Sequence, residues 1–270
     1  MTEMNCLITP TGAIPCHLLD MDGVLVRGME PIEKSADYVK LLSKNKVPFL
    51  VFSNNSRFTP KMLASRIRRL GFELDDTQVY TSAVTTADFI YSQNPDATCF
   101  PIGEAGLIEA LQEKGLRFNE VDPDYVVVGE SINHSFAELT RGVQMVLKGA
   151  RFVGTNPDMT IPAEGGIIPA CGSACAMIEA ATGTAAYFVG KPNSFMMRAA
   201  LAQLDRHPSE TIMVGDRIDT DVRAGMELGL KTVLVLTGAS SKSSLQQYPY
   251  SPDLVVPKLH DLASVFLFDD

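Results

Sequence analysis

The sequence has few cysteines and no long apolar run. Its longest apolar stretches, such as residues 47–52, reach about six residues, far short of the roughly 20 that cross a bilayer. The five cysteines are odd in number and their spacings fit no zinc pattern, so we expect neither a disulfide framework nor a zinc site. Reduced thiols are typical of a cytoplasmic protein. No positive residue precedes Arg27, and no signal peptide is expected.

Positive charge is also scarce. The chain carries 23 Lys and Arg against 32 Asp and Glu, a formal net charge of −9. Nucleic acid would be repelled by this balance, and no basic stripe offsets it. A phosphorylated metabolite would be repelled as well, unless a cation or backbone dipoles reverse the sign at its binding site.

What the sequence does have is a regular alternation of short apolar runs and amphipathic helical patterns. Strands are expected at residues 18–19, 49–52, 79–80, 98–102, 125–128, 152–154, 187–189, 211–214 and 232–236. Helices are expected at residues 31–45, 60–70, 85–91, 105–114, 136–148, 173–181, 194–204 and 220–228. This βα alternation predicts an α/β fold with parallel sheets, and 270 residues are enough for two domains.

Two carboxylates end the first apolar run. Asp20 and Asp22 are two positions apart, so in an extended segment both side chains face one side, and Gly23 follows. Ligands of open parallel sheets bind at the carboxyl ends of strands, where this pair would lie. Asp-x-Asp-Gly also opens calcium loops, but the twelfth position of such a loop holds Pro31 instead of Glu.

Three later segments also place polar groups directly after a strand. Ser53 and Asn54 offer the hydroxyl, amide and backbone donors that a phosphoryl group needs, although such residues are also common in turns. Lys191 lies where a strand meets a helix, a position that a surface lysine could equally occupy. Asp216 follows a strand, and Asp221 lies at a helix start, where the helix dipole alone would favour it.

Taken together, these segments resemble the haloacid dehalogenase superfamily, and within it the NagD-like phosphatases. The resemblance covers nearly the whole chain. Its motifs are residues 20–25, 53–56, 81–83, 154–158, 190–192 and 215–221. The family implies a Rossmann-like, doubly wound parallel sheet as the catalytic core, with a second α/β domain inserted as a cap.

The resemblance also implies a role for each motif residue. Asp20 would be the nucleophile and a magnesium ligand, and Asp22 the general acid/base with its backbone carbonyl on the metal. Ser53, Asn54 and Lys191 would bind the phosphoryl group. Asp216 would be the third protein ligand of Mg²⁺, and Asp221 a nearby or water-mediated partner. The implied activity is Mg²⁺-dependent hydrolysis of a small phosphomonoester, such as a nucleotide, sugar phosphate or aryl phosphate, through an aspartyl-phosphate.

The spacing of the motifs predicts where the cap lies. Only a flap and one helix fit between Asp22 and Ser53, whereas the stretch from Ser53 to Lys191 leaves room for a separate domain. We therefore expect a core of residues 1–87 and 187–270 and a cap of residues 88–186. In this cap, residues 155–158 could meet the substrate or form an ordinary turn. A homodimer through the cap is implied by the resemblance only.

Other activities on the same fold remain as alternatives. A phosphomutase usually carries a helical cap after the first motif, and the short gap before Ser53 disfavours it. A dehalogenase needs neither magnesium nor an acid at Asp22. A non-catalytic protein that binds a phosphorylated metabolite would not need Asp20, Asp22, Lys191 and Asp216 together.

Overall fold

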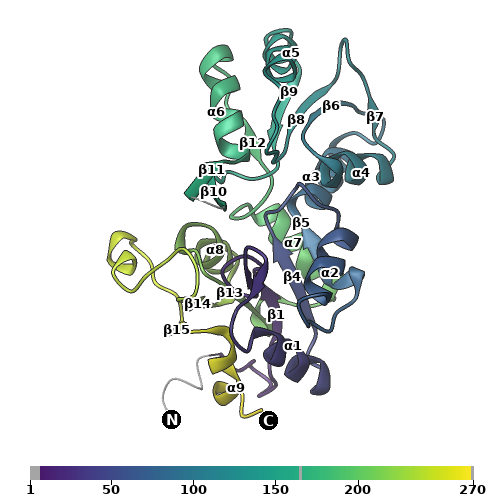
Figure 1. Cartoon of the computed structure of the whole chain (residues 1–270). Helices are drawn as coiled ribbons and strands as arrows, with labels where there is room; N and C mark the ends of the chain where they lie inside the picture. The colour runs from purple at the N-terminus through teal and green to yellow at the C-terminus, as the bar shows by residue number, and fades with distance from the viewer. Residues whose placement is uncertain (1–6, 164–165, 269–270) are drawn as a thin grey trace. The chain divides into compact units, whose positions relative to one another are not determined.

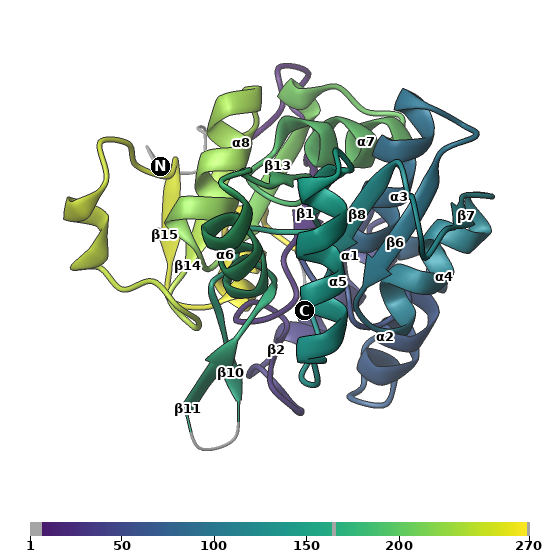
Figure 2. The ribbon, with the colours of Figure 1, turned by 90° about the horizontal axis from the view of Figure 1, so that it is seen from above.

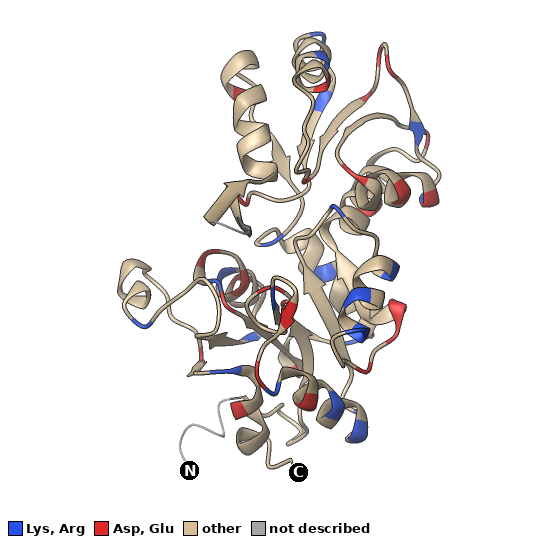
Figure 3. Cartoon of the chain, viewed as in Figure 1, with Lys and Arg blue, Asp and Glu red and all other residues tan. Residues whose placement is uncertain are grey.

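The computed structural model describes residues 7–163 and 166–268, which divide into two compact units. Unit 1 comprises residues 7–53, 63–80 and 196–268, and unit 2 comprises Asn54–Met62 and Thr81–Phe195. The predicted cap, residues 88–186, lies within unit 2, and its boundaries as a domain stay a prediction. Residues of both charge signs occur in both units (Figure 3).

Unit 1 is built on a six-stranded sheet in the order β15-β14-β13-β1-β4-β5. The pairs β1–β13, β1–β4, β13–β14 and β14–β15 are all parallel. In chain order this is the 3-2-1-4-5-6 arrangement of a doubly wound sheet, the kind of core that the resemblance implies. The strands are β1 (Cys16–Leu19), β4 (Phe49–Ser53), β5 (Val79–Thr81), β13 (Thr211–Gly215), β14 (Lys231–Val235) and β15 (Leu254–Val256).

Helices and a small hairpin complete unit 1 (Figure 1). The helices are α1 (Ser35–Lys44), α2 (Pro60–Arg68), α7 (Ser194–Leu204), α8 (Arg223–Leu228) and α9 (Leu262–Val265), and α2 and α7 each begin in unit 2. The antiparallel pair β2 (Val26–Arg27) and β3 (Glu30–Pro31) forms a flap between β1 and α1. The central strands β1, β4 and β13 are buried along their whole length, as expected for a parallel sheet covered on both faces.

Unit 2 holds a second parallel sheet, in the order β12-β9-β8-β6-β7. Its strands are β6 (Thr98–Ile102), β7 (Arg117–Phe118), β8 (Tyr125–Val128), β9 (Arg151–Gly154) and β12 (Tyr187–Phe188). Its helices are α3 (Ser82–Gln93), α4 (Ala105–Glu113), α5 (Phe136–Leu147) and α6 (Cys171–Thr182). A separate antiparallel hairpin joins β10 (Thr160–Ala163) to β11 (Gly166–Pro169).

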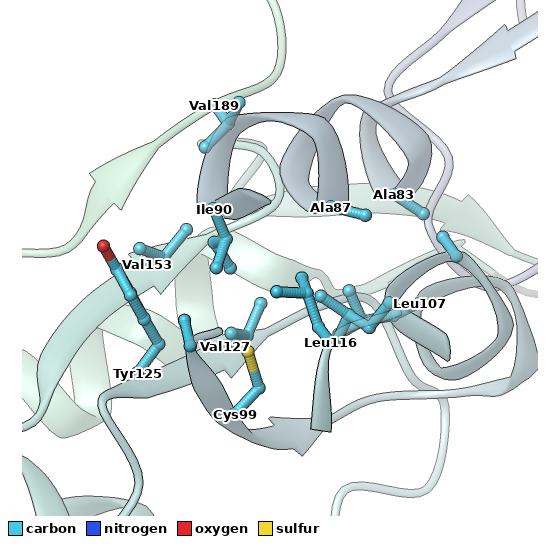
Figure 4. Close-up of a cluster of buried hydrophobic side chains, with 13 residues drawn as sticks. Ala83, Ala87, Ile90, Cys99, Leu107, Leu116, Tyr125, Val127, Val153 and Val189 are labelled. Atoms are coloured by element: carbon cyan, nitrogen blue, oxygen red, sulfur yellow. The ribbon is translucent and has the colours of Figure 1, made fainter. Parts of the chain in front are cut away.

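Alternate residues of the unit 2 strands pack into two hydrophobic cores, one on each face of the sheet. Cys99 and Val127 pack with α3 and α4 on one face (Figure 4), whereas Phe100 and Val126 pack with α5 and α6 on the other. The view in Figure 2 separates these two helix pairs across the sheet. Because both faces are covered by helices, unit 2 is an α/β layer structure like unit 1.

The described cysteines are free thiols: Cys16, Cys99, Cys171 and Cys175 are buried, and Cys6 lies outside the described residues. Cys171 and Cys175 lie on α6, one turn apart, with their sulfur atoms 4.0 Å apart. Both are buried small residues on one face of this helix. The cytoplasmic location stays a prediction.

Candidate active site

Two aspartates follow neighbouring central strands of unit 1. Asp20 comes directly after β1 and Asp216 directly after β13, and these strands pair in parallel with Leu19 opposite Val214. The register therefore brings positions 20 and 216 to the same edge of the sheet. The strand order reverses between β1 and β13, and ligands of open α/β sheets bind outside the carboxyl ends of the strands at such a point.

A third carboxylate joins these two. One carboxylate oxygen from each of Asp20, Asp216 and Asp221 lies within 4.8 Å of the others, and all three residues are buried. Three buried negative charges at this spacing repel one another unless a cation or shared protons offset the charge. The donors are oxygen only, which suits hard cations such as Mg²⁺ and Ca²⁺ rather than zinc. The residues present therefore fit a divalent metal.

The carboxylate of Asp216 is held by backbone that approaches it closely. The N–H of Ala239 donates to Asp216 Oδ2 at 2.6 Å. A Cβ added to Gly238 would lie 1.9 Å from that oxygen, and one added to Gly23, whose φ is +85°, would lie 2.4 Å from it. Only glycine fits at these two positions, so the loop after β14 and the turn after β1 together fix the orientation of Asp216.

Asp221 lies in a π-helical turn, η4 (Ile218–Val222), directly before α8. The sequence predicts an α-helix from residue 220, whereas the structure has a π-helical turn there. Such turns are frequent at functional sites. Its Oδ2 accepts a hydrogen bond from the N–H of Arg217 at 3.1 Å. A Cβ on Gly215 would lie 2.2 Å from that of Asp221, so this glycine makes room for the third carboxylate.

Asp22 and Ser53 are not members of the carboxylate group. Asp22 is exposed, and its backbone forms an isolated bridge with Val26 at the start of the flap. Ser53 is buried at the end of β4, the strand beside β1. Their parts in acid/base chemistry, metal binding and phosphate binding stay predictions.

Asn54 and Lys191 belong to unit 2, where they are hydrogen-bonded to each other. Asn54 Oδ1 accepts from the backbone N–H of Lys191 at 2.8 Å, and Asn54 Nδ2 donates to the Lys191 carbonyl at 3.2 Å. The same Nδ2 donates to Asp158 Oδ2 at 2.9 Å. Lys191 is 2% exposed and lies between β12 and α7, the predicted link between a strand and a helix. The Asn54 amide thus orients the backbone of Lys191.

Sequence reasoning missed two features around these residues. The loop of Thr237 to Ala239, which contacts Asp216, carries no recognisable motif and acts through backbone groups. Glu130, buried after β8, is a single glutamate in a polar stretch. No local sequence pattern reveals either one, because both depend on contacts between residues far apart in the sequence.

Comparisons with known proteins show the family of this chain. A family model described as haloacid dehalogenase-like hydrolase matches residues 17–117, and a second, described as HAD-hydrolase-like, matches residues 188–262. Dihydroxyacetone phosphatase of Corynebacterium glutamicum is 43% identical over 92% of this chain and 90% of its own length. Ribonucleotide monophosphatase NagD of Escherichia coli K12 is 35% identical over 91% of this chain and 96% of its own.

Solved structures are similar over the same extent. The p-nitrophenyl phosphatase of Archaeoglobus fulgidus superposes with a TM-score of 0.87 at 35% identity, covering 93% of this chain and 98% of that one. The NagD structure from E. coli K-12 gives a TM-score of 0.86 at 34% identity, covering 95% and 99%.

The chain therefore belongs to the haloacid dehalogenase-like hydrolases, in the group of NagD-like phosphatases. It is a phosphomonoester hydrolase. Phosphatases of this superfamily generally use a divalent metal, and the Asp20–Asp216–Asp221 group could hold one. Among the described residues, no helix is both long and apolar enough to span a membrane.

Proposed function

We propose that the enzyme is a Mg²⁺-dependent phosphatase that works through an aspartyl-phosphate on Asp20. The observation that carries this proposal is the group of three buried carboxylates at the reversal point of the unit 1 sheet. Asp20, Asp216 and the backbone carbonyl of Asp22 would hold the ion. Asp221 would be a direct or water-mediated partner. When bound, Mg²⁺ would neutralise the carboxylates and the phosphate dianion, and so let the two approach.

The chain's own residues would then carry two steps. In the first, a carboxylate oxygen of Asp20 attacks phosphorus, the bond from phosphorus to the ester oxygen breaks, and that oxygen takes a proton from Asp22. In the second, water attacks the phosphorus of the aspartyl-phosphate, gives a proton to Asp22, and releases phosphate with Asp20 restored. A carboxylate nucleophile divides one difficult hydrolysis into two easier displacements.

Phosphate binding would fall to Ser53, Asn54 and Lys191. Ser53 would donate through its hydroxyl and Lys191 through its ammonium group. Because the Asn54 side chain bonds to Lys191 and Asp158, we propose that Asn54 contributes its backbone N–H to the phosphate. Positioning and charge neutralisation are most of what phosphoryl transfer needs, and these donors supply both.

The substrate that we propose first is a small sugar phosphate. The 43% identical relative is named dihydroxyacetone phosphatase, whereas relatives near 35% are named acid sugar phosphatase or ribonucleotide monophosphatase. A panel of dihydroxyacetone phosphate, other sugar phosphates, ribonucleoside monophosphates and p-nitrophenyl phosphate should rank them by kcat/KM. A three-carbon substrate reaching about 10⁴ M⁻¹s⁻¹, the low end for typical enzymes, would support the proposal. A nucleotide preferred tenfold over every sugar phosphate would refute it.

The metal and the intermediate need separate tests. Turnover of p-nitrophenyl phosphate should vanish with a chelator and return on adding Mg²⁺ but not Ca²⁺, which is larger and less demanding in geometry. Acid quenching during turnover should trap phosphate on the protein, and mass spectrometry should place it on Asp20. Full activity in chelator, or phosphate trapped on another residue, would contradict the mechanism.

A further inference from the structure

Unit 2 contains a buried carboxyl group that the mechanism above does not use. Glu130 follows β8 and is 4% exposed. Its Oε2 accepts a hydrogen bond from the backbone N–H of Ser56 at 3.3 Å, and its Oε1 accepts one from Asn156 Nδ2 at 3.2 Å. Both oxygens of the carboxyl group therefore bind donors from segments distant in the sequence.

Ser56 is tied to this part of unit 2 through its side chain as well. Its hydroxyl oxygen accepts hydrogen bonds from the backbone N–H of Glu130 at 2.8 Å and from the hydroxyl of Thr155 at 2.9 Å. Ser56 and Glu130 thus bind each other in both directions, backbone to side chain. Ser56 is completely buried, so breaking these bonds would leave polar groups without water to replace them.

The hydrogen bonds continue from Asn156 to the predicted phosphate-binding residues. Asn156 Nδ2 also donates to the backbone carbonyl of Asn54 at 2.8 Å. The side chain of Asn54 in turn binds the N–H and the carbonyl of Lys191. An unbroken path of hydrogen bonds, all within unit 2, therefore runs from Glu130 to Lys191.

The surroundings of Glu130 favour its neutral form. Burial raises its pKa to about 8, and the Cys171 thiol on α6 and the Asp158 carboxylate after β9 add to the rise. The hydrogen bonds from Ser56 and Asn156 oppose it. Those two bonds, at 3.3 and 3.2 Å, are longer than the roughly 2.7–2.9 Å typical of charged acceptors. A neutral carboxyl group can be buried here without a cation.

We propose that Glu130 and Asn156 are positioning residues for phosphate binding, which hold the backbone of residues 54–56 and, through Asn54, that of Lys191. This inference rests on the proposed function, because it assumes that Asn54 and Lys191 bind the phosphoryl group. Neither Glu130 nor Asn156 needs to touch the substrate. Their effect would be on how well the phosphate donors are oriented before the substrate arrives.

The variant Glu130→Gln tests the pair. An amide offers one acceptor and one donor, so either Ser56 N–H or Asn156 Nδ2 would face an NH₂ group and lose its bond. We expect the Kd for inorganic phosphate, measured by calorimetry with Mg²⁺, and the KM for p-nitrophenyl phosphate to rise about tenfold, with a smaller change in kcat. The matched control is Glu113→Gln, an exposed glutamate on α4, which should leave both unchanged.

The pH dependence gives a second readout that a purely structural role would not move. In the native enzyme, phosphate affinity should change as Glu130 ionises near pH 8, because the carboxylate binds the Ser56 and Asn156 donors more strongly than the neutral group does, and Glu130→Gln should lack this change. A folded Glu130→Gln enzyme with phosphate Kd and KM within twofold of the native values would overturn the inference.

A milder variant covers the case in which Glu130→Gln does not fold. Ser56→Ala keeps Glu130 but removes the oxygen that accepts from Glu130 N–H and Thr155, and we expect phosphate affinity to fall about threefold. Unchanged affinity would count against the inference. If the native enzyme itself bound no phosphate and showed no Mg²⁺-dependent turnover, the proposed function would fail and this inference with it; a native enzyme that binds phosphate with unaltered variants refutes the inference alone.

Discussion

Units 1 and 2 each bury carboxyl groups near the ends of parallel strands. The two units differ in how the negative charge of these groups is neutralised. In unit 1 each of three carboxylates places one oxygen within 4.8 Å of the other two. This excess of negative charge calls for a cation. In unit 2 Glu130 stands among N–H donors, and burial keeps it neutral to about pH 8. The same chemical group thus builds a metal site in one unit and an internal support in the other.

The largest expected effect is at the metal site. Asp20→Asn removes the nucleophile and one charge of the carboxylate group, so we expect kcat for p-nitrophenyl phosphate to fall by at least about 10³-fold. The fold should survive, because an amide of the same size relieves repulsion among Asp20, Asp216 and Asp221. The control is Asp37→Asn, an exposed aspartate on α1. Full activity of Asp20→Asn would end the proposed mechanism.

The next effect concerns how Asp216 is held. Gly238→Ala places a methyl group 1.9 Å from the original position of Asp216 Oδ2, so the carboxylate has to turn away. We expect Mg²⁺ affinity, measured by calorimetry without substrate, to fall about 10- to 100-fold, as for other residues that orient metal ligands. Gly149→Ala is the control, because its φ of +111° makes the added Cβ strained while nothing lies within 4 Å of it, so Mg²⁺ affinity should stay unchanged. Equal losses in both variants would mean that the contact with Asp216 is not the cause.

Glu130 should make unit 2 sensitive to alkali. Its pKa is 4.5 in the unfolded chain and about 8 in the folded one, so the folded state binds the proton more tightly. The stabilisation is fully present below pH 4.5 and is lost as the pH rises through 8. Glu130→Gln should flatten the fall of Tm between pH 5 and 9 by about 2 °C or more. An unchanged slope would show that Glu130 is ionised when folded.

His17 should make unit 1 sensitive to acid in the opposite sense. This fully buried residue of β1 lies 2.8 Å from the Tyr38 hydroxyl and 2.9 Å from the Pro15 carbonyl, and burial lowers its pKa from 6.5 to about 3. The folded state therefore releases the proton, and stability is lost as the pH falls from 6.5 towards 3. Urea unfolding at pH 4.5 and 7 should show a smaller difference for His17→Gln than for the exposed control His207→Gln.

Local pattern predicted most of both sheets. The strand at residues 98–102 and the helix at residues 194–204 have the predicted bounds, and most others differ by a few residues. The sequence did not reveal the hairpin β10–β11, the two-residue strand β7 or the strand β15. These segments are short or exposed, and an apolar run as short as the three residues of β15 is too brief to mark a strand.

Local sequence signals likewise predicted some residues of the candidate site and not others. Asp20 and Asp216 could be predicted because strand ends and Gly-Asp pairs are local signals, and parallel pairing then brings them together. The close approach of Gly238 to Asp216 and the bonds of Glu130 to Ser56 could not, because each joins segments far apart in the sequence. Nothing near residue 130 or 238 distinguishes them from ordinary loop positions.

The reciprocal bonds between Ser56 and Glu130 bear on the making of chimeric enzymes. A crossover at residues 88 and 186 would transplant Glu130 and Asn156 while leaving Ser56 behind with its former host. A graft that also carries Asn54–Met62 takes all of these hydrogen-bond partners from the same parent protein. A chimera made with the longer graft should therefore keep the bonds that hold residues 54–56. A chimera made with the shorter graft should need compensating substitutions.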